Sequence, residues 1–312
     1  MKQITTQDSK LGFIGIGYMG LPIARRLLEA GFHLTVFDRE RSNSEKLIPH
    51  GGAVAESVAD LATKCDVIFS CLPNDAIVMS VQAGPDGVLS TAARASLVIE
   101  MSTVNPQTAR ELSQLGAARG IGVLDVTISG STPAAEKGQV ILFGGGGEAC
   151  FDAAAPAFRA FARKYFHLGP SGSGAMMKLV VNALLGIGMQ AIAEAVAFGE
   201  KSGLDRNRLL NVLSETAVVA PAHVGKLERA AHGDYTPQFP IRLMNKDFGL
   251  ILSLAAAVGA QMPATAAAFE VNSSQMQLGA EQDFSAVILQ MEKRAHFDAS
   301  GANPSARSAT SK

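Results

Sequence analysis

Lys178 and Asn182 are the residues of this chain whose types and spacing most directly suggest chemistry. They lie four residues apart in a stretch from Met176 to Phe198 that contains no proline and only one further charged residue, Glu194. This stretch predicts one long, largely buried helix. Because residues four apart share a helix face, an amine that could exchange a proton and a carboxamide that could orient a ligand would point the same way.

An ammonium and a carboxamide are costly to bury among Met, Leu and Val without partners, so we expect these two side chains to face a cleft. The alternative is a lysine that reaches solvent along its apolar stem and a core asparagine whose hydrogen bonds are satisfied. The apolar interval between Lys178 and Glu194 is shorter than the ~20 residues that a bilayer requires, and it contains Asn182 and Gln190. A membrane-spanning segment is therefore not expected.

A glycine-rich turn near the N-terminus forms the second chemical pattern. Gly15, Gly17 and Gly20 follow a short apolar strand and precede a helix-like segment, Leu21 to Ala30. In this setting the glycines allow a tight turn, close approach of the backbone to a pyrophosphate and close packing of helix on strand, and the helix start offers free N–H groups. We predict a dinucleotide site, with an ordinary turn between strand and helix as the alternative.

Asp38 ends a second predicted strand that begins at His33. A carboxylate in this place can accept both ribose hydroxyls of NAD and repels the extra phosphate of NADP. Arg39 follows directly, and its guanidinium could stack on adenine or hold a 2′-phosphate. NAD is therefore favoured, and NADP stays open.

Strand and helix patterns then alternate along the chain. This alternation predicts an α/β fold with a doubly wound, mostly parallel sheet. After residue 172 the strand patterns cease, and helical periodicity continues to residue 294. The further predicted strands span residues 66–72, 97–102, 122–126 and 140–143.

Three parts are expected on this basis. Residues 10–171 would form a dinucleotide-binding domain, and residues 172–296 an all-helical substrate and oligomerisation domain that begins with the long interdomain helix. Residues 297–312 are rich in Ser, Ala and Gly and predict a flexible tail. The polar residues 1–10 predict a short disordered leader without the apolar core of a signal peptide.

Ligands of doubly wound sheets bind beyond the carboxyl ends of the strands. The predicted turns at residues 72–74, 102–103 and 129–131 are therefore candidate ligand contacts, although each taken singly could be a plain polar loop. Asn245-Lys246-Asp247 lies in the middle of an otherwise apolar helix predicted over residues 241–258. This cluster is either part of a site or a solvated helix face.

Composition restricts the partners of this 312-residue chain. Its 27 Lys plus Arg nearly balance its 28 Asp plus Glu, so no basic surface indicates nucleic acid or acidic lipid, and a small molecule is the expected partner. The cysteines, Cys65, Cys71 and Cys150, have neither metal-ligand spacing nor a disulfide pattern, and a cytoplasmic location fits. Apolar surface on the helical domain predicts a homodimer or homotetramer.

Four motifs of the chain resemble those of the β-hydroxyacid dehydrogenases. The turn Gly15-Ile-Gly-Tyr-Met-Gly20 resembles the G-x-G-x-M-G of that family, and Asp125-Val-Thr-Ile-Ser-Gly-Ser131 is similar to its D-x-P-V-S-G-G. Gly174-x-x-x-Lys178-x-x-x-Asn182 resembles its catalytic helix, and Lys246-Asp247-Phe248 its K-D-L element. Order and spacing agree from about Lys10 to Met291, which is nearly the whole chain.

The resemblance implies a Rossmann domain followed by a helical domain, and the reversible oxidation of a short 3-hydroxy acid to its semialdehyde with a nicotinamide cofactor. Lys178 would be the catalytic acid and base. Asn182 would orient the substrate hydroxyl, and Ser129 and Gly130 would hold the substrate carboxylate. The cofactor would lie against the glycine turn with Tyr18 and Met19, against Leu72 and Pro73, and, on its nicotinamide side, against Thr103 and Lys246.

Two departures from the family pattern leave the substrate open. Thr127 stands where the family usually has proline, and Ser131 stands where it has the second glycine, so an added hydroxymethyl group narrows the pocket or adds a polar contact. 3-Hydroxyisobutyrate, glycerate with 2-hydroxy-3-oxopropionate, and 4-hydroxybutyrate with succinic semialdehyde all fit. An imine reductase of the same fold, which usually has another residue in place of Lys178, and a non-catalytic dinucleotide-binding module are the alternatives.

Overall fold

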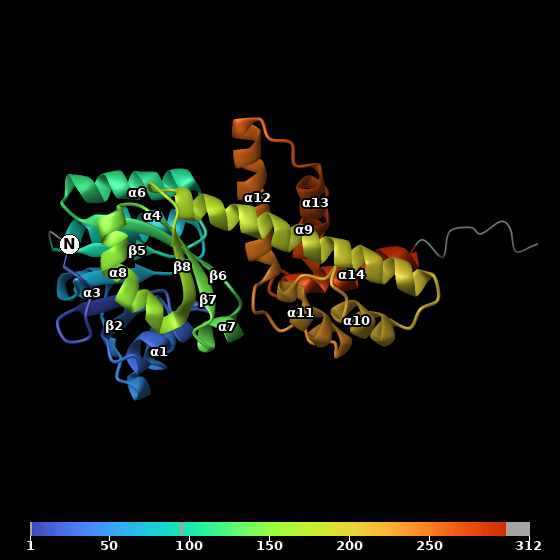
Figure 1. Ribbon diagram of the computed structural model, residues 1–312, viewed down its shortest axis with the longest axis horizontal. Coiled ribbons are helices and arrows are strands. Elements are labelled where there is room, and N and C mark those ends of the chain that lie inside the picture. The colour runs from blue at the N-terminus through green and yellow to red at the C-terminus, as the bar shows by residue number, and fades with distance from the viewer. Residues whose placement is uncertain (1, 94–95, 298–312) are drawn as a thin grey trace, which may run out of the picture. The chain divides into compact units, whose positions relative to one another are not determined.

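An eight-stranded sheet organises the N-terminal part of the chain (Figure 1). The computed structural model describes residues 2–93 and 96–297, and the chain packs as two units that divide between Val181 and Asn182. The strand order is β3-β2-β1-β4-β5-β6-β7-β8, and among these described strands only β6 and β7 pair antiparallel, which confirms the predicted doubly wound, mostly parallel sheet. The strands span Lys10–Ile14 (β1), His33–Phe37 (β2), Ala53–Val54 (β3), Val67–Ser70 (β4), Leu97–Glu100 (β5), Gly122–Ser129 (β6), Val140–Gly145 (β7) and Ala162–His167 (β8).

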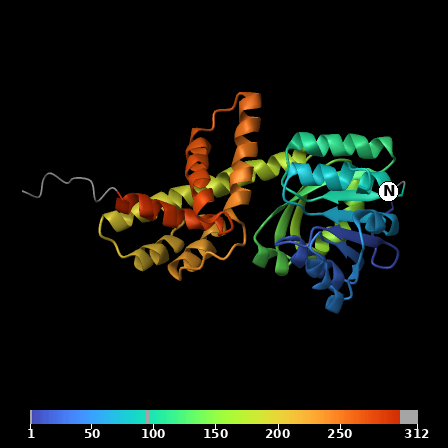
Figure 2. The ribbon, with the colours of Figure 1, turned by 180° about the vertical axis from the view of Figure 1, so that it is seen from behind.

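Helices cover both faces of this sheet because the central strands are apolar on both faces. In β4, Phe69 packs in one buried cluster with α1 and α8, whereas its neighbour Ile68 packs in a second cluster with α3, α4, α5 and α6. Figure 1 shows α8 on one side of the sheet, and Figure 2 shows α4, in cyan, on the other. The helices of this unit span Gly20–Glu29 (α1), Arg41–Glu45 (α2), Ile48–His50 (η1), Val58–Lys64 (α3), Asp75–Ala83 (α4), Val88–Thr91 (α5), Pro106–Ala118 (α6), Thr132–Glu136 (α7) and Glu148–Phe161 (α8).

Two strands and the N-terminal segment differ from the sequence expectations. The two-residue β3 is too short to show a pattern, and β8 is an edge strand in which Arg163, Lys164 and Phe166 are exposed, so it lacks the apolar signature of a buried strand. The prediction of a disordered leader is wrong at Ile4. This side chain is 3% exposed within the sheet cluster, and its amide donates to the Ala153 carbonyl at 3.0 Å.

The second unit is helical, as predicted. The two units divide within α9, and the expected tail begins at Phe297, the last residue of α14, so its remaining residues, 298–312, lie outside the described part of the chain. The helices span Ser173–Lys201 (α9), Arg206–Ser214 (α10), Pro221–Ala231 (α11), Ile241–Val258 (α12), Pro263–Gly279 (α13), Phe284–Ala286 (η2) and Val287–Phe297 (α14).

Only one face of α9 is buried. Ala193 and Val196 are fully covered, but Leu184 and Phe198 are 71% and 75% exposed, so the prediction of a largely buried helix is wrong for this outer face. By length and composition α9 is the one described helix apolar enough to cross a bilayer, a test that core helices pass as well.

A buried ion pair holds the second unit together. Lys226 of α11 donates to Asp283 Oδ2 at 2.7 Å, and the same oxygen accepts from the amides of Gln238 and Phe239. Burial opposes ionisation of Asp283, but Lys226 and these donors outweigh it and hold the pKa of this carboxyl below its ordinary value. The pair therefore joins α11 to the loop before α12 and to the start of η2.

Candidate active site

The glycine turn joins β1 to α1 and leaves open backbone beside the first turn of the helix. Gly15 has φ +93°, and a Cβ there would collide with the Cys71 carbonyl oxygen. A Cβ on Gly20 would collide with the Gly15 carbonyl, whereas one on Gly17 would meet nothing within 4 Å. Close packing thus requires glycine at residues 15 and 20. Gly17 leaves space in which a pyrophosphate can approach the N–H groups of α1, so the turn fits a dinucleotide.

The remaining predicted cofactor residues of this region lie around the turn. A Cβ on Gly15 would stand 3.2 Å from Leu72 Cδ2, so Leu72 borders the turn directly. Tyr18 is 46% exposed, and Met19 precedes α1 and packs against the sheet cluster. Pro73 is exposed at the end of the β4 segment.

Asp38 follows β2 and supports the glycine turn. Its Oδ2 accepts from the Ile16 amide at 2.7 Å, and its Oδ1 accepts from the Glu40 amide at 2.8 Å and from Asn43 Nδ2 at 3.3 Å. Arg39 is exposed next to it. The carboxylate therefore lies beside the open turn, where a dinucleotide-binding sheet has its ribose contact.

A buried carboxyl group connects the turns that follow β4 and β5. The Leu72 amide donates to Ser102 Oγ at 2.7 Å, the Ser102 amide donates to Glu100 Oε1 at 2.9 Å, and Gln82 Nε2 donates to Glu100 Oε2 at 3.0 Å. Burial raises the pKa of Glu100 despite these donors. The network joins the turn that carries Leu72 to the turn that carries Thr103.

Strand β6 holds the first turn of α9. Asp125 is 3% exposed, and its carboxylate accepts from the amides of Gly172 and Ala175, both at 2.9 Å. Burial raises its pKa even so. Thr127 Oγ1 donates to the Gly174 carbonyl at 2.9 Å, and a Cβ on Gly174 would collide with the Asp125 carbonyl. The start of α9 thus packs directly on β6. The Asp125 carboxylate supplies an acceptor for amides at the helix start, which have no partner within the helix.

The same strand ends at Ser129. Gly130 follows with φ +146°, where a residue with a side chain would be strained, and it is exposed, as is Ser131. Lys178 lies one turn beyond the anchored start of α9 and is half-buried. The loop expected to bind the substrate carboxylate therefore follows β6, and the helix that carries Lys178 is hydrogen-bonded to the same strand.

Asn182 and Asp247 form a buried pair in the second unit. Each is 1% exposed, and Asn182 Nδ2 donates to Asp247 Oδ2 at 2.6 Å. Lys246 Nζ lies 2.9 Å from Asp247 Oδ1. Because Asp247 is buried, a solvated face is excluded at this residue, and a site role for the cluster stays a prediction.

Family models match nearly the whole chain. Residues 10–169 match the NAD binding domain of 6-phosphogluconate dehydrogenase, and residues 172–291 match the NAD-binding domain of NADP-dependent 3-hydroxyisobutyrate dehydrogenase. A 3-hydroxyisobutyrate dehydrogenase of Pseudomonas aeruginosa is 36% identical over 287 residues, which cover 89% of this chain and 96% of the relative. The chain belongs to the β-hydroxyacid dehydrogenase family. As a member, it is an NAD(P)-dependent oxidoreductase.

Two further relatives agree with this membership in the β-hydroxyacid dehydrogenases. Glyoxylate/succinic semialdehyde reductase 1 of Arabidopsis thaliana is 35% identical over 280 residues, which cover 89% of this chain and 97% of the relative. A crystal structure of a 3-hydroxyisobutyrate dehydrogenase from Salmonella typhimurium superposes with a TM-score of 0.84 at 28% identity and covers 90% of this chain and 99% of that one.

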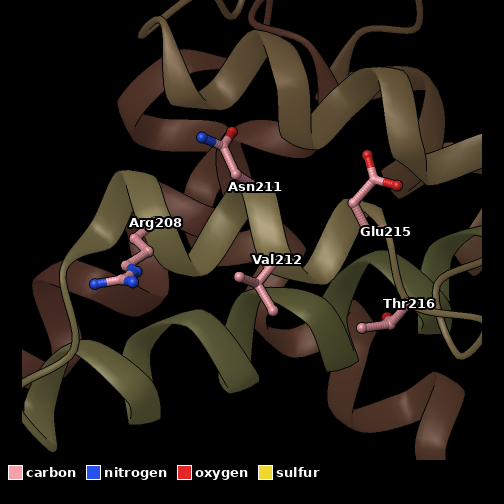
Figure 3. Close-up of a pocket in the computed structure, with 5 residues that line it drawn as sticks. All are labelled: Arg208, Asn211, Val212, Glu215 and Thr216. Atoms are coloured by element: carbon pink, nitrogen blue, oxygen red, sulfur yellow. The ribbon is translucent and has the colours of Figure 1, made fainter.

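A surface depression at α10 of the dehydrogenase is lined by none of the residues predicted for the site (Figure 3). Asn211 and Glu215 point outward from the helix there, whereas Val212 points toward the neighbouring helix. The lining of the depression contains no lysine and no glycine turn of the kind found in the family motifs. Its lining consists of Arg208, Asn211, Val212, Glu215 and Thr216.

Sequence reasoning about this β-hydroxyacid dehydrogenase missed three supporting residues. Glu100 and Asp125 are single carboxyl groups in otherwise apolar strands, and that isolation was the available signal because an unpaired buried carboxylate is costly. The threonine in place of proline at residue 127 was noticed as a departure, but its bond to Gly174 follows only from the fold.

Proposed function

We propose that this β-hydroxyacid dehydrogenase interconverts a short 3-hydroxy acid and its semialdehyde, and that Lys178 moves the proton. One observation carries the proposal: β6 ends at Ser129 and, through Asp125 and Thr127, also holds the first turn of the helix that bears Lys178. The relatives support the reaction class, since they include a 3-hydroxyisobutyrate dehydrogenase and a glyoxylate/succinic semialdehyde reductase.

Each residue then has a defined task. The cofactor, when bound, supplies or accepts the hydride. In reduction the Lys178 ammonium gives a proton to the substrate carbonyl oxygen, and in oxidation the neutral amine takes the hydroxyl proton. The Ser129 hydroxyl and the Gly130 amide receive the substrate carboxylate, and Asn182 orients the hydroxyl.

Lys178→Ala tests the assignment. We expect kcat to fall by at least ~10²-fold, the usual effect of a lost general acid or base, with little change in cofactor affinity measured by fluorescence titration. Lys201→Ala is the matched control, because Lys201 lies on the same helix and donates to the Ala295 carbonyl at 2.9 Å. Near-wild-type turnover of Lys178→Ala would exclude Lys178 as the proton donor.

The cofactor is proposed to be NAD rather than NADP, because the Asp38 carboxylate lies beside the glycine turn. Its other contacts are proposed to be those implied by the family motifs, with Thr103 and Lys246 on the nicotinamide side. A cytoplasmic location is also proposed, in keeping with free cysteines at residues 65, 71 and 150, and fractionation of cells that express the tagged protein tests it.

The substrate is proposed from a panel, namely 3-hydroxyisobutyrate, glycerate with 2-hydroxy-3-oxopropionate, and 4-hydroxybutyrate with succinic semialdehyde. Absorbance at about 340 nm follows reduced cofactor with each member in either direction. Cofactor binding without turnover across the whole panel would favour a non-catalytic binding module instead.

The parts of the chain are proposed to have separate tasks, with residues 10–171 binding the dinucleotide and residues 172–296 serving the substrate and the assembly. A homodimer or homotetramer is proposed because large apolar side chains stay exposed on the second unit. Phe198 is 75% exposed, Leu184 71% and Val218 88%. Soluble monomers seldom leave such side chains uncovered together.

A further inference from the structure

Asp247 contacts Asn182 through a short buried hydrogen bond. Its Oδ2 accepts from Asn182 Nδ2 at 2.6 Å, and both side chains are 1% exposed. A hydrogen bond this short between buried polar groups fixes their relative orientation, because breaking it would leave a carboxylate and an amide without partners in an apolar interior.

Close packing of α12 against α9 produces the contact. Gly186 lies one turn after Asn182, and a Cβ there would collide with the ring of Phe248. Phe248 directly follows Asp247 and is 2% exposed. Because Gly186 has no side chain, the ring seats against α9 and brings the neighbouring carboxylate to Asn182.

The carboxylate determines which way the carboxamide faces. An ionised carboxylate only accepts hydrogen bonds, so the NH2 group of Asn182 must be the part directed at Asp247. Lys246 Nζ lies 2.9 Å from the other carboxylate oxygen, so a cation and not an acceptor faces that side of Asp247. Asn182 Oδ1 is therefore turned away from Asp247. It is buried, and no residue in the described part of the chain donates a hydrogen bond to it.

We propose that Asp247 is a positioning residue that holds Asn182 Oδ1 as the acceptor for the substrate hydroxyl group. This inference rests on the proposed function, in which Asn182 is a substrate ligand. A carbonyl oxygen accepts a hydrogen bond from a hydroxyl group but not from a C–H group. The site therefore binds acids that carry a hydroxyl group more tightly than the same acids without one. Asp247 therefore contributes to substrate recognition through Asn182 and without touching the substrate.

Asp247→Asn reverses the proposed orientation with almost no change in shape. The Lys246 ammonium cannot accept a hydrogen bond, so the new carboxamide turns its oxygen to Lys246 and its NH2 group to Asn182. Asn182 must then turn its own oxygen to residue 247 and present its NH2 group where the acceptor was. The substitution thus exchanges an acceptor for a donor at the substrate position.

The measurement is a ratio of dissociation constants, obtained by calorimetry on the full chain saturated with NADH, with which a hydroxy acid cannot react. The ligand pairs are 3-hydroxyisobutyrate with isobutyrate and 4-hydroxybutyrate with butyrate. For the wild type we expect the hydroxy acid of at least one pair to bind about tenfold more tightly, the worth of one hydrogen bond. In Asp247→Asn we expect the ratio to fall close to one.

A merely structural role of Asp247 would weaken both acids of a pair equally and leave the ratio unchanged, which would overturn the proposal. Asp283→Asn is the matched control, since Asp283 is also buried and also paired with a lysine, Lys226, 2.7 Å away. We expect this control to lower the melting temperature and to keep the wild-type ratio.

A double-mutant cycle tests whether Asp247 acts through Asn182. In an Asn182→Ala background, Asp247→Asn should cause no further change in the ratio or in kcat/KM. An added loss in that background, or a wild-type ratio near one for both pairs, would overturn the inference. Failure of the proposed function is a separate result, namely no turnover of the panel and no effect of Lys178→Ala.

Discussion

Asp38 supports the glycine turn and is also proposed to select the cofactor, and a substitution can separate these two tasks. One carboxylate oxygen accepts from the Ile16 amide in the glycine turn, and the other accepts from the Glu40 amide. The acceptor function supports the turn, whereas the negative charge is what would repel the 2′-phosphate of NADP. The proposed preference for NAD depends on the charge alone.

Asp38→Asn should therefore reduce the cofactor preference while it keeps the turn. An asparagine retains an oxygen for the Ile16 amide but has no charge, and a like charge at about 4 Å costs about 1 kcal/mol in water and more in a partly buried site. We expect the ratio of kcat/KM for NADH over NADPH to fall about tenfold, measured by initial rates with both cofactors.

Asp38→Ala is the companion variant, because it removes the charge and the acceptor together. It should lower the ratio equally and should also raise KM for both cofactors, since the turn loses its bond to Ile16. A wild-type enzyme that prefers NADPH would contradict the proposal and would assign the 2′-phosphate to Arg39.

At the scale of elements, strand β6 is the part of the molecule on which the proposed chemistry depends most. It contributes Asp125 and Thr127 to the start of α9 and then ends at Ser129. The Gly174 carbonyl that accepts from Thr127 lies four residues before Lys178, and helix geometry pairs this carbonyl with the Lys178 amide. A shift of the helix start would therefore displace the lysine directly.

Thr127→Val should lower both stability and turnover. It keeps the shape of the side chain but removes the bond to Gly174, which is worth about 1 kcal/mol and about 2–4 °C in melting temperature for a unit of this size. We also expect kcat to fall several-fold with cofactor KM unchanged, because small displacements of a catalytic group are costly.

Thr91→Val is the control for that experiment. Its hydroxyl also donates to a backbone carbonyl, that of Gly87 at 2.8 Å, but that bond lies between α5 and its own N-cap residue and does not involve α9. We expect a similar loss of melting temperature and a wild-type kcat. Equal kcat values for the two variants would show that the bond of Thr127 serves stability alone.

At the scale of the whole molecule, the exposed apolar residues on the second unit require an explanation. Phe198 and Leu184 are exposed on α9, and Val212 of α10 is 57% exposed. An apolar helix face of this kind is normal for a surface that a second copy of the chain covers. The assembly would bury it without any change in the fold.

Leu184→Glu combined with Phe198→Glu should shift the protein from a dimer or tetramer to a monomer. Sedimentation velocity measures the shift, and the reason is the cost of burying two carboxylates in an apolar interface. Leu115→Glu, an exposed apolar residue of α6 that is 41% accessible, should leave the assembly unchanged. A monomeric wild type would contradict the proposed oligomer.

Much of the architecture was predictable because its signals are local. Helix α12 begins and ends at the predicted residues, Ile241 and Val258, since apolar periodicity and the following glycine mark it within the segment itself. The glycine turn was predictable for the same reason, because Gly15, Gly17 and Gly20 lie within one short stretch. β8 was missed because an exposed edge strand needs no apolar alternation.

By itself, then, the sequence determined an α/β sheet followed by helices, the glycine turn and the spacing of Lys178 and Asn182 along one helix, but it did not reveal β3 or β8. Only the tertiary structure decided what holds those groups, because the partners lie far apart along the chain. Asp125 is 47 residues from Gly172, and Asn182 is 65 residues from Asp247. Periodicity reports which side of an element is buried, but which donor meets which acceptor depends on how distant segments pack.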